Sequence, residues 1–169
     1  MIICDSREKK NSHILHYFDK NKIPYKVTLM AVADYMLEDN RYIAIDRKQN
    51  LEECCRNLTY KGKTKKENGG KPIPSDVARF WREVRRAYAN GIKMVVLVEH
   101  GEGIRTINDV AAWNDSRSGI TGRQLIDEMD RVSTAYGVEW QFCRKSETAE
   151  EILKILNFKG ENYYGQNHN

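Results

Sequence analysis

The sequence predicts an α/β domain built on a mixed β-sheet, and three observations carry that prediction. Short apolar runs typical of strands alternate with segments whose apolar residues recur at helical spacing. One of these runs, residues 94–98, is continuously apolar, as in a strand that is covered on both faces. Two other runs flank a polar turn, which predicts an antiparallel hairpin. The length of 169 residues fits one domain with its own core.

The first part of the chain is predicted to contain four strands and two helices. In chain order these are a strand at Ile2–Cys4, a helix at Ser12–Asn21, a strand at Tyr25–Leu29, hairpin strands at Asp34–Leu37 and Tyr42–Ile45, and a helix at Asn50–Leu58. The first helix places Ile14, Leu15 and Phe18 on one face, which is therefore expected to pack on the sheet. The antiparallel hairpin makes the otherwise α/β sheet a mixed one.

The second part begins with the segment 60–74, which is rich in Gly, Pro and Lys and is predicted to be a basic flexible loop. The elements after it are a helix at Asp76–Asn90, a strand at Met94–Glu99, a helix from Thr121 or Gly122 to Tyr136, a strand at Val138–Cys143 and a helix at Thr148–Phe158. Thr148 and Glu151 have the spacing of a capping box. Residues 1–158 form the predicted domain, and 159–169 a polar tail.

The composition indicates a soluble protein of a reducing compartment. No apolar run approaches the ~20 residues of a membrane-spanning helix, and the amino terminus lacks the apolar stretch of a signal peptide. The four cysteines show no C-x-x-C spacing, which argues against a zinc site or a disulfide framework. We therefore expect a cytoplasmic protein that uses neither a membrane nor a small-molecule cofactor.

Positive charge gathers in two segments, although the net charge is only +4. The cations are Lys61, Lys63, Lys65, Lys66 and Lys71 in the predicted loop and Arg79, Arg82 and Arg86 in the helix after it. A charge run is most often simply a solvated face. The same clusters would suit the phosphate backbone of a nucleic acid. Charge alone leaves both interpretations open.

The predicted hairpin places two aspartates opposite each other. If the turn is centred near Asn40, facing residues have numbers that add up to 80, so Asp34 faces Asp46. Lys48 follows two residues later on the same side of the strand. Two facing carboxylates repel unless a cation lies between them, and a hard divalent ion such as Mg²⁺ or Mn²⁺ suits that geometry.

This trio of side chains fits phosphodiester hydrolysis. A metal ion held by Asp34 and Asp46 polarises a phosphate oxygen and activates water. The ammonium of Lys48 orients that water or stabilises the charge that develops in the transition state. The alternative is that all three are ordinary solvent-facing strand residues with a surface ion pair, because such spacing is common by chance.

Three ordered motifs resemble the nuclease domain of the XPF family, whose signature is G-D … E-R-K-x-x-x-D. They are Asp5-Ser6-Arg7-Glu8 after the first strand, Ala33-Asp34-Tyr35, and Ile45-Asp46-Arg47-Lys48. The resemblance implies a restriction-endonuclease-like fold of the PD-(D/E)xK superfamily, with a central mixed β-sheet flanked by helices. It also implies a divalent-metal-dependent, structure-specific endonuclease that hydrolyses phosphodiester bonds in branched or flapped DNA.

The resemblance assigns a role to each motif residue. Asp34 and Asp46 would ligate Mg²⁺ or Mn²⁺ with help from the Arg47 carbonyl, and Lys48 would be the catalytic lysine. The other residues lining the same site would be Asp5, Arg7 and Glu8. The side chain of Arg47 would support the site or contact DNA.

Three positions depart from the pattern of that family. Ala33 stands in place of the usual glycine, Asp46 in place of the usual glutamate, and Glu52 where the trailing aspartate is expected. All three keep the charge pattern, but the shorter side chain of Asp46 puts the metal preference in doubt.

The resemblance leaves the partners and the substrate open. It implies a homodimer, since the family often dimerises through this domain. One alternative is a non-catalytic DNA-binding partner module. Another keeps the site and changes the substrate, as in a Holliday-junction resolvase or an RNA-directed nuclease.

Overall fold

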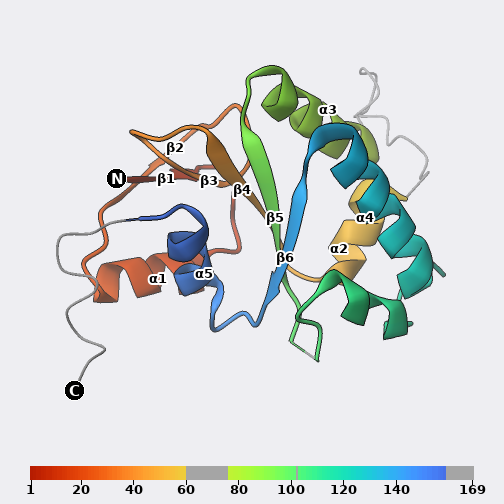
Figure 1. The fold of residues 1–169 in the computed structure, drawn as a ribbon. Coiled ribbons are helices and arrows are strands. Elements are labelled where there is room, and N and C mark those ends of the chain that lie inside the picture. The colour runs from red at the N-terminus through yellow and green to blue at the C-terminus, as the bar shows by residue number, and fades with distance from the viewer. Residues whose placement is uncertain (60–75, 102, 159–169) are drawn as a thin grey trace, which may run out of the picture.

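The computed structural model describes residues 1–59, 76–101 and 103–158. The predicted loop at 60–74, with its five lysines, and the tail at 159–169 lie outside the described residues. Within the described chain the strands form one sheet in the order β2-β1-β3-β4-β5-β6 (Figure 1). The strands are β1 (Ile2–Asp5), β2 (Tyr25–Thr28), β3 (Tyr35–Leu37), β4 (Ile43–Lys48), β5 (Lys93–Glu99) and β6 (Glu139–Cys143). The sheet is mixed, because β3 pairs antiparallel with both β1 and β4 while the other pairings are parallel.

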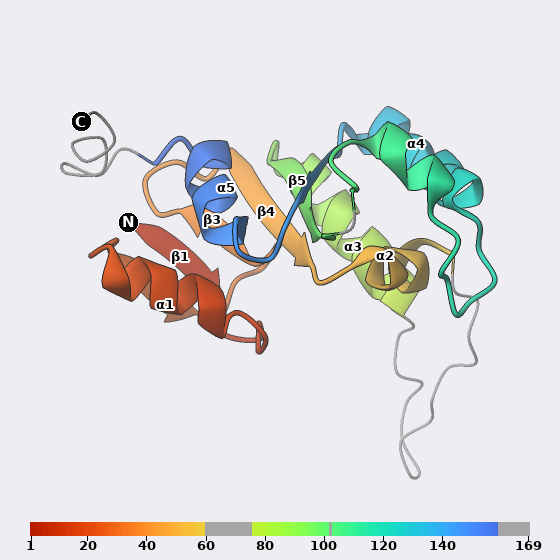
Figure 2. The same ribbon diagram turned by 90° about the horizontal axis from the view of Figure 1, so that it is seen from below.

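Helices cover both faces of this sheet. They are α1 (Ser12–Lys20), α2 (Leu51–Leu58), α3 (Asp76–Ala89), α4 (Gly122–Tyr136), α5 (Thr148–Ile155) and the short 3₁₀ helix η1 (Ile107–Ala112). Figures 1 and 2 show α1 and α5 on one side and α2, α3 and α4 on the other. Each side has its own apolar core. Among the described residues no helix is both long and apolar enough to cross a membrane.

The register predicted for the hairpin is confirmed, since Tyr35 pairs with Ile45 and Met36 with Ala44. The predicted end of its second strand is wrong, because β4 continues to Lys48. β5 pairs with β4 along this whole length, which supplies the hydrogen bonds that keep the polar residues in the strand. The hairpin strands β3 and β4 are central in the sheet, so both faces of each strand are buried.

The start of α5 also differs from the prediction. Glu147 is the N-cap residue, and it makes no capping hydrogen bond through its side chain. The hydroxyl of Thr148, expected to cap the helix, donates instead to Oε1 of Glu99 at 2.8 Å. The capping-box prediction is therefore wrong, because a buried carboxylate at the end of β5 takes the hydroxyl.

The topology brings the polar strand ends together. β1, β4, β5 and β6 run in the same direction, so their carboxyl ends lie along one edge of the sheet. Ligands of open α/β sheets commonly bind at this edge. The motif residues at 5–8 and 46–48 lie at the ends of β1 and β4.

Candidate functional site

Three of the predicted site residues meet on the face of the sheet that α2 and α3 cover. Asp46 and Lys48 lie two residues apart in β4, so their side chains point to the same side of the sheet. Nζ of Lys48 lies 2.8 Å from Oδ1 and 2.7 Å from Oδ2 of Asp46, and 5.2 Å from the ring centre of Phe80 on α3. Asp34 lies just before β3, and its Oδ2 accepts a hydrogen bond from the backbone nitrogen of Arg47 at 2.8 Å.

The charges in this trio are coupled. Burial and the neighbouring charge of Asp46 raise the pKa of Asp34 well above its ordinary value of 3.8. Burial alone would lower the pKa of Lys48, but Asp46 and Asp34 together raise it above its ordinary 10.5. Lys48 is therefore a permanent cation, which suits stabilisation of negative charge better than proton abstraction.

The donor set fits a hard divalent cation. Oδ2 of Asp46 is buried and has no hydrogen-bond partner in the described chain, although the ammonium of Lys48 lies beside it. Asp46 contacts this ammonium and Asp34 feels the charge of both, so a further positive charge would relieve the repulsion between the two carboxylates. Among the described residues no three His, Cys, Asp or Glu side chains could hold a metal together. Binding through two carboxylates, with water and phosphate completing the shell, is the usual mode of Mg²⁺.

Asp5 anchors Arg7 beside this trio. Oδ1 of Asp5 accepts from N and Nε of Arg7 at 2.7 and 3.0 Å, and Oδ2 accepts from Nη2 of Arg7 at 2.7 Å and from N of Met30 at 3.1 Å. Burial alone would raise the pKa of Asp5, but the hydrogen bonds from Arg7 and Met30 lower it. The side chain of Arg7 is 57% exposed, whereas that of Asp5 is buried. Asp5 thus positions Arg7, and Arg7 is the residue that can reach a ligand.

Arg47 and Glu8 lie on the opposite face of β4. Nη2 of Arg47 donates to Oε1 of Glu8 and Nη1 donates to Oε2 of Glu99, both at 2.8 Å. Glu99 also accepts from Thr148 and contacts Nε2 of His13 at 2.7 Å. The side chain of Arg47 is only 1% exposed. Of the two roles expected for it, support of the site agrees with this geometry, whereas DNA could reach the side chain only through a pocket that Arg47 lines on this face.

Comparison with known proteins identifies the family. A model of the ERCC4 domain matches residues 4–156. The chain belongs to the ERCC4 family. This family consists of structure-specific DNA nucleases, so the finding confirms the resemblance to XPF-type nuclease domains.

A solved structure shows the same fold. It is XPF from Aeropyrum pernix in complex with DNA, with a TM-score of 0.62 and 15% sequence identity. The match covers 92% of the present chain and 62% of that chain, so the ERCC4 domain spans about three-fifths of the length of this relative. Among curated proteins none matches in sequence. The predicted fold class, a mixed sheet flanked by helices, is confirmed.

Glu52, at the trailing acidic position of the family signature, holds a loop in this ERCC4 domain. Its Oε2 accepts from the backbone nitrogen of Arg117 at 3.1 Å, and its Oε1 accepts from the hydroxyl of Ser118 at 3.0 Å. These contacts attach α2 to the segment before α4. The structure therefore does not group Glu52 with Asp34 and Asp46.

The arginines predicted to bind DNA form one stripe on α3. Arg79, Arg82 and Arg86 recur at spacings of three and four, which places them on one side of the helix. Arg79 pairs with Asp76 at 3.3 Å, and Nη1 of Arg86 donates to the carbonyl of Ala31 at 2.7 Å. Arg82 is exposed. The five predicted lysines, Lys61, Lys63, Lys65, Lys66 and Lys71, lie outside the described residues.

Sequence reasoning missed Glu83, which lies on α3 next to the site. It follows Phe80 by three residues and is half-buried. Burial and the charge of Asp46 raise the pKa of Glu83, while Lys48 and Arg7 act in the opposite direction. The signal in the sequence was its position beside the arginine stripe, but only the packing of α3 on β5, the neighbour of β4, brings it near Asp46.

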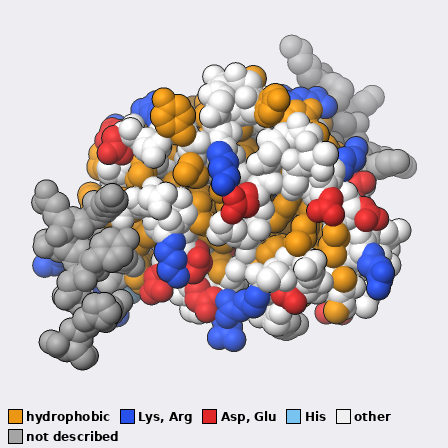
Figure 3. Space-filling view, in the orientation of Figure 1, with side chains coloured by type: hydrophobic (Ala, Val, Ile, Leu, Met, Phe, Trp, Pro, Cys, Tyr) orange, Lys and Arg blue, Asp and Glu red, His pale blue; other side chains and the backbone are white. Residues whose placement is uncertain are grey.

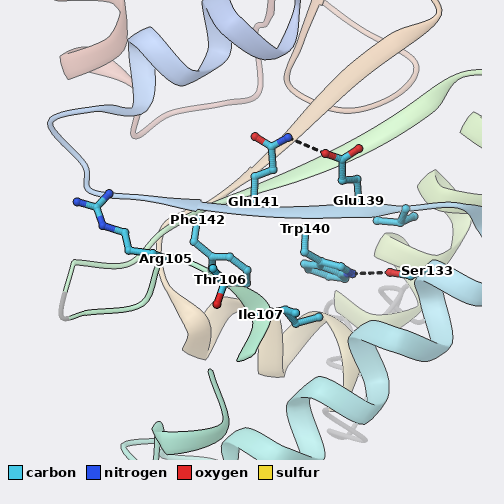
Figure 4. A pocket seen from close by; sticks show the side chains of 9 residues that line it. Arg105, Thr106, Ile107, Ser133, Glu139, Trp140, Gln141 and Phe142 are labelled. Carbon is cyan, nitrogen blue, oxygen red and sulfur yellow. Dashed lines mark hydrogen bonds between the residues drawn. The ribbon is translucent and has the colours of Figure 1, made fainter. Parts of the chain in front are cut away.

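A pocket of about 520 Å³ lies away from these carboxylates, beside the edge strand β6. Figure 4 shows Trp140 and Phe142 on one side of this strand and Glu139 and Gln141 on the other. Glu139 is already paired with Lys93 and accepts from Gln141 at 2.7 Å. Acidic and basic side chains alternate over the face in Figure 3. This pocket brings no second group of catalytic carboxylates to the ERCC4 domain.

Proposed function

We propose that this ERCC4 domain is a divalent-metal-dependent endonuclease that hydrolyses phosphodiester bonds in branched or flapped DNA. The observation that carries the proposal is the arrangement of Asp34, Asp46 and Lys48, in which Asp46 binds the ammonium and a second carboxylate lies near enough to act on both charges. Family membership supports it, because ERCC4 nucleases are generally divalent-metal dependent. The DNA-bound relative of the same fold supports DNA as the partner.

Each residue has a distinct task in this proposal. Asp34 and Asp46 hold Mg²⁺ or Mn²⁺ with help from the Arg47 carbonyl, and the bound ion supplies Lewis acidity for the phosphate and for water. Lys48, oriented by Asp46, stabilises negative charge on the phosphate in the transition state. Arg7, fixed by Asp5, contacts a neighbouring phosphate oxygen. Glu8 acts indirectly, because it helps to hold Arg47 in place.

DNA binding outside the site is assigned to the two basic clusters. The arginine stripe of α3 contacts backbone phosphates, as do the lysines of the 60–74 segment. Contacts to phosphates do not depend on the base sequence of the DNA, which suits a protein that recognises DNA structure. The homodimer implied by the family stays a prediction, which sedimentation analysis tests. A cytoplasmic, nucleoid-associated location is also a prediction.

A non-catalytic DNA-binding module is the main alternative. It would derive no benefit from two carboxylates that face each other in a partly buried site, because like charges there destabilise the fold. A Holliday-junction resolvase and an RNA-directed nuclease would use the same trio. Cleavage assays on flap, fork, four-way junction, linear duplex and RNA substrates with Mg²⁺, Mn²⁺ or EDTA show which of these functions the domain has.

The decisive variant is Asp46→Asn. It keeps the shape of the side chain and removes one metal ligand, so cleavage of flapped DNA should be abolished. DNA binding in EDTA and the free energy of unfolding should change little, because Asp34 still balances the charge of Lys48. Asp39→Asn, in the exposed turn between β3 and β4, is the matched control and should cut normally. An Asp46→Asn variant that cuts at the wild-type rate would exclude the proposed metal site.

A further inference from the structure

A second polar pocket lies on the α1 and α5 side of the sheet, across β4 from Asp46 and Lys48. It measures about 420 Å³. The buried side chains of Arg47 and Glu99 line its inner part, and the exposed lysines Lys9, Lys10 and Lys145 line its outer part. The chemistry proposed for Asp34, Asp46 and Lys48 does not use this pocket.

Two distant turns bring the lysines together. Lys9 and Lys10 lie in the connection from β1 to α1, and Lys145 lies in the turn from β6 to α5. Because β1, β4, β5 and β6 end at the same edge of the sheet, these turns meet beside the end of β4. The pocket therefore belongs to the same edge as the metal site.

The lysines give the pocket an excess of positive charge. The carboxylate of Glu99 already accepts a hydrogen bond from Nη1 of Arg47 at 2.8 Å, and His13 and Thr148 are its further partners. Nζ of Lys9 donates to a backbone carbonyl, that of Ser6, at 3.1 Å. Within the described chain no carboxylate pairs with any of the three ammonium groups. A ligand for this pocket should thus be an anion.

Arg47 adds an unsatisfied donor to the pocket. Its Nη atoms bind Glu8, Glu99 and the carbonyl of Lys10, but its buried Nε has no hydrogen-bond partner among the described residues. A buried donor without an acceptor is costly, so most such groups are paired in folded proteins. An oxygen of a bound anion would complete the hydrogen bonds of this guanidinium.

We propose that this pocket binds a phosphate group of the DNA strand that is cut at Asp46. This inference rests on the proposed nuclease function. Arg47 lies between Asp46 and Lys48 in β4, so a strand that crosses the carboxyl edge of the sheet meets both faces. The volume is in the range of pockets that hold small organic ligands, which is sufficient for a nucleotide phosphate. The phosphate is either internal to the strand or at its end.

The test compares two double variants with the same loss of charge. The variant Lys10→Ala/Lys145→Ala removes two of the lysine side chains that line the pocket. The control Lys20→Ala/Lys26→Ala removes two exposed lysines elsewhere. Binding of flapped DNA is measured by fluorescence anisotropy in EDTA over a range of salt concentrations. The pocket variant should bind at least about 10-fold more weakly. The slope of log K against log salt concentration should become shallower by roughly 0.9 for each duplex phosphate contact removed. The control should stay close to the wild type.

The DNA ends distinguish the two sources of phosphate. With a terminal phosphate, the loss of affinity appears only for DNA that carries a 5′ or a 3′ phosphate, and vanishes for hydroxyl-ended DNA. With an internal phosphate, the loss persists on hydroxyl-ended and circular DNA. Equal affinities of the pocket variant and the control on all of these DNAs would overturn the proposal.

A direct probe is the Nε–H signal of Arg47 in NMR spectra of the ¹⁵N-labelled protein. It should shift when a short DNA duplex is added in EDTA, and this shift should be lost in Lys10→Ala/Lys145→Ala. A signal that saturating DNA leaves unmoved would also overturn the proposal. Both tests need no cleavage. An Asp46→Asn variant that still cuts would therefore refute the metal site, and would leave the binding result to be judged separately.

Discussion

The two faces of β4 carry the same kinds of charge in opposite arrangements. On one face, Arg47 lies between Glu8 and Glu99, and each carboxylate is bound by a donor. On the other face, Asp46 alone contacts the ammonium of Lys48, while Oδ2 of Asp34 accepts from the backbone nitrogen of Arg47. Each face thus has one cation for two carboxylates, but only on the first does that cation donate to both of them.

This difference separates a supporting face from a reacting face. A buried charge network in which each carboxylate has a partner orients its members firmly. Carboxylates that repel each other destabilise the fold until a cation joins them, so they suit a site that binds metal and phosphate. The predictions below test that distinction by removing one member from each face.

The largest effect is expected from Arg47→Ala. Its removal leaves Glu8 and the buried Glu99 without their shared guanidinium, so the free energy of unfolding should fall by about 3–5 kcal/mol. Urea denaturation measures this change. Arg82→Ala, an exposed arginine on α3, serves as the control and should stay within about ±0.5 kcal/mol. A loss for Arg47→Ala as small as that of the control would show that the network contributes little.

Lys48→Ala should act on the rate of cleavage. Loss of one charge-stabilising donor typically lowers kcat by about 10²–10³. The affinity for Mn²⁺, measured by calorimetric titration, should change little, because Lys48 is not a metal ligand in this proposal. If Lys48→Ala loses Mn²⁺ as completely as Asp46→Asn, the role of Lys48 is to hold the carboxylates in place.

The pH dependence of stability should have opposite signs at Asp5 and Asp34. Asp5 has a lowered pKa in the folded protein, so its contribution is present above about pH 3.8 and disappears as the pH falls through the lower folded pKa. Asp34 has a raised pKa, so the folded protein holds a proton that the unfolded chain has lost. The free energy of unfolding therefore falls as the pH rises from 3.8 through the folded pKa of Asp34.

Denaturation in EDTA at pH 4 and pH 7 measures both effects. At pH 7, Asp5→Asn should lower the free energy of unfolding by about 1.5–3 kcal/mol, since it weakens hydrogen bonds to a charged acceptor. Asp34→Asn should raise it by up to about 1 kcal/mol, since it removes a like-charge contact. The Asp34→Asn difference should shrink at pH 4, whereas the Asp5→Asn difference should persist there and shrink only as the pH falls below about 3.8. Changes of the same sign in the two variants would show that Asp34 is not under strain from Asp46.

The smallest effect is expected at Ala33, next to Asp34. Its φ of 58° lies in the left-handed region that favours glycine, which explains why glycine is usual at this position in the family. Ala33→Gly should raise the free energy of unfolding by at most about 1 kcal/mol, because loss of a buried methyl group opposes the relief of strain. Cleavage should be unchanged. Ala33→Val, with a branched side chain in the same conformation, should destabilise the protein.

Much of the reacting face was predictable from the sequence. Alternation along a strand places Asp46 and Lys48 on one side, and the polar turn near Asn40 sets the hairpin register that the structure confirms. The order of the three motifs also predicted the family. These features depend on neighbours in the chain or on one tight turn, so local patterns were sufficient.

The tertiary structure alone decided what each of these side chains meets. Glu99 joins Arg47 to Thr148 only because β5 lies beside β4 and α5 packs on β5. Glu83 comes near Asp46 only because α3 also packs on β5. Periodicity determines the side to which a residue points. The partner on that side comes from elements more than 30 residues away in the chain, and long-range packing places it.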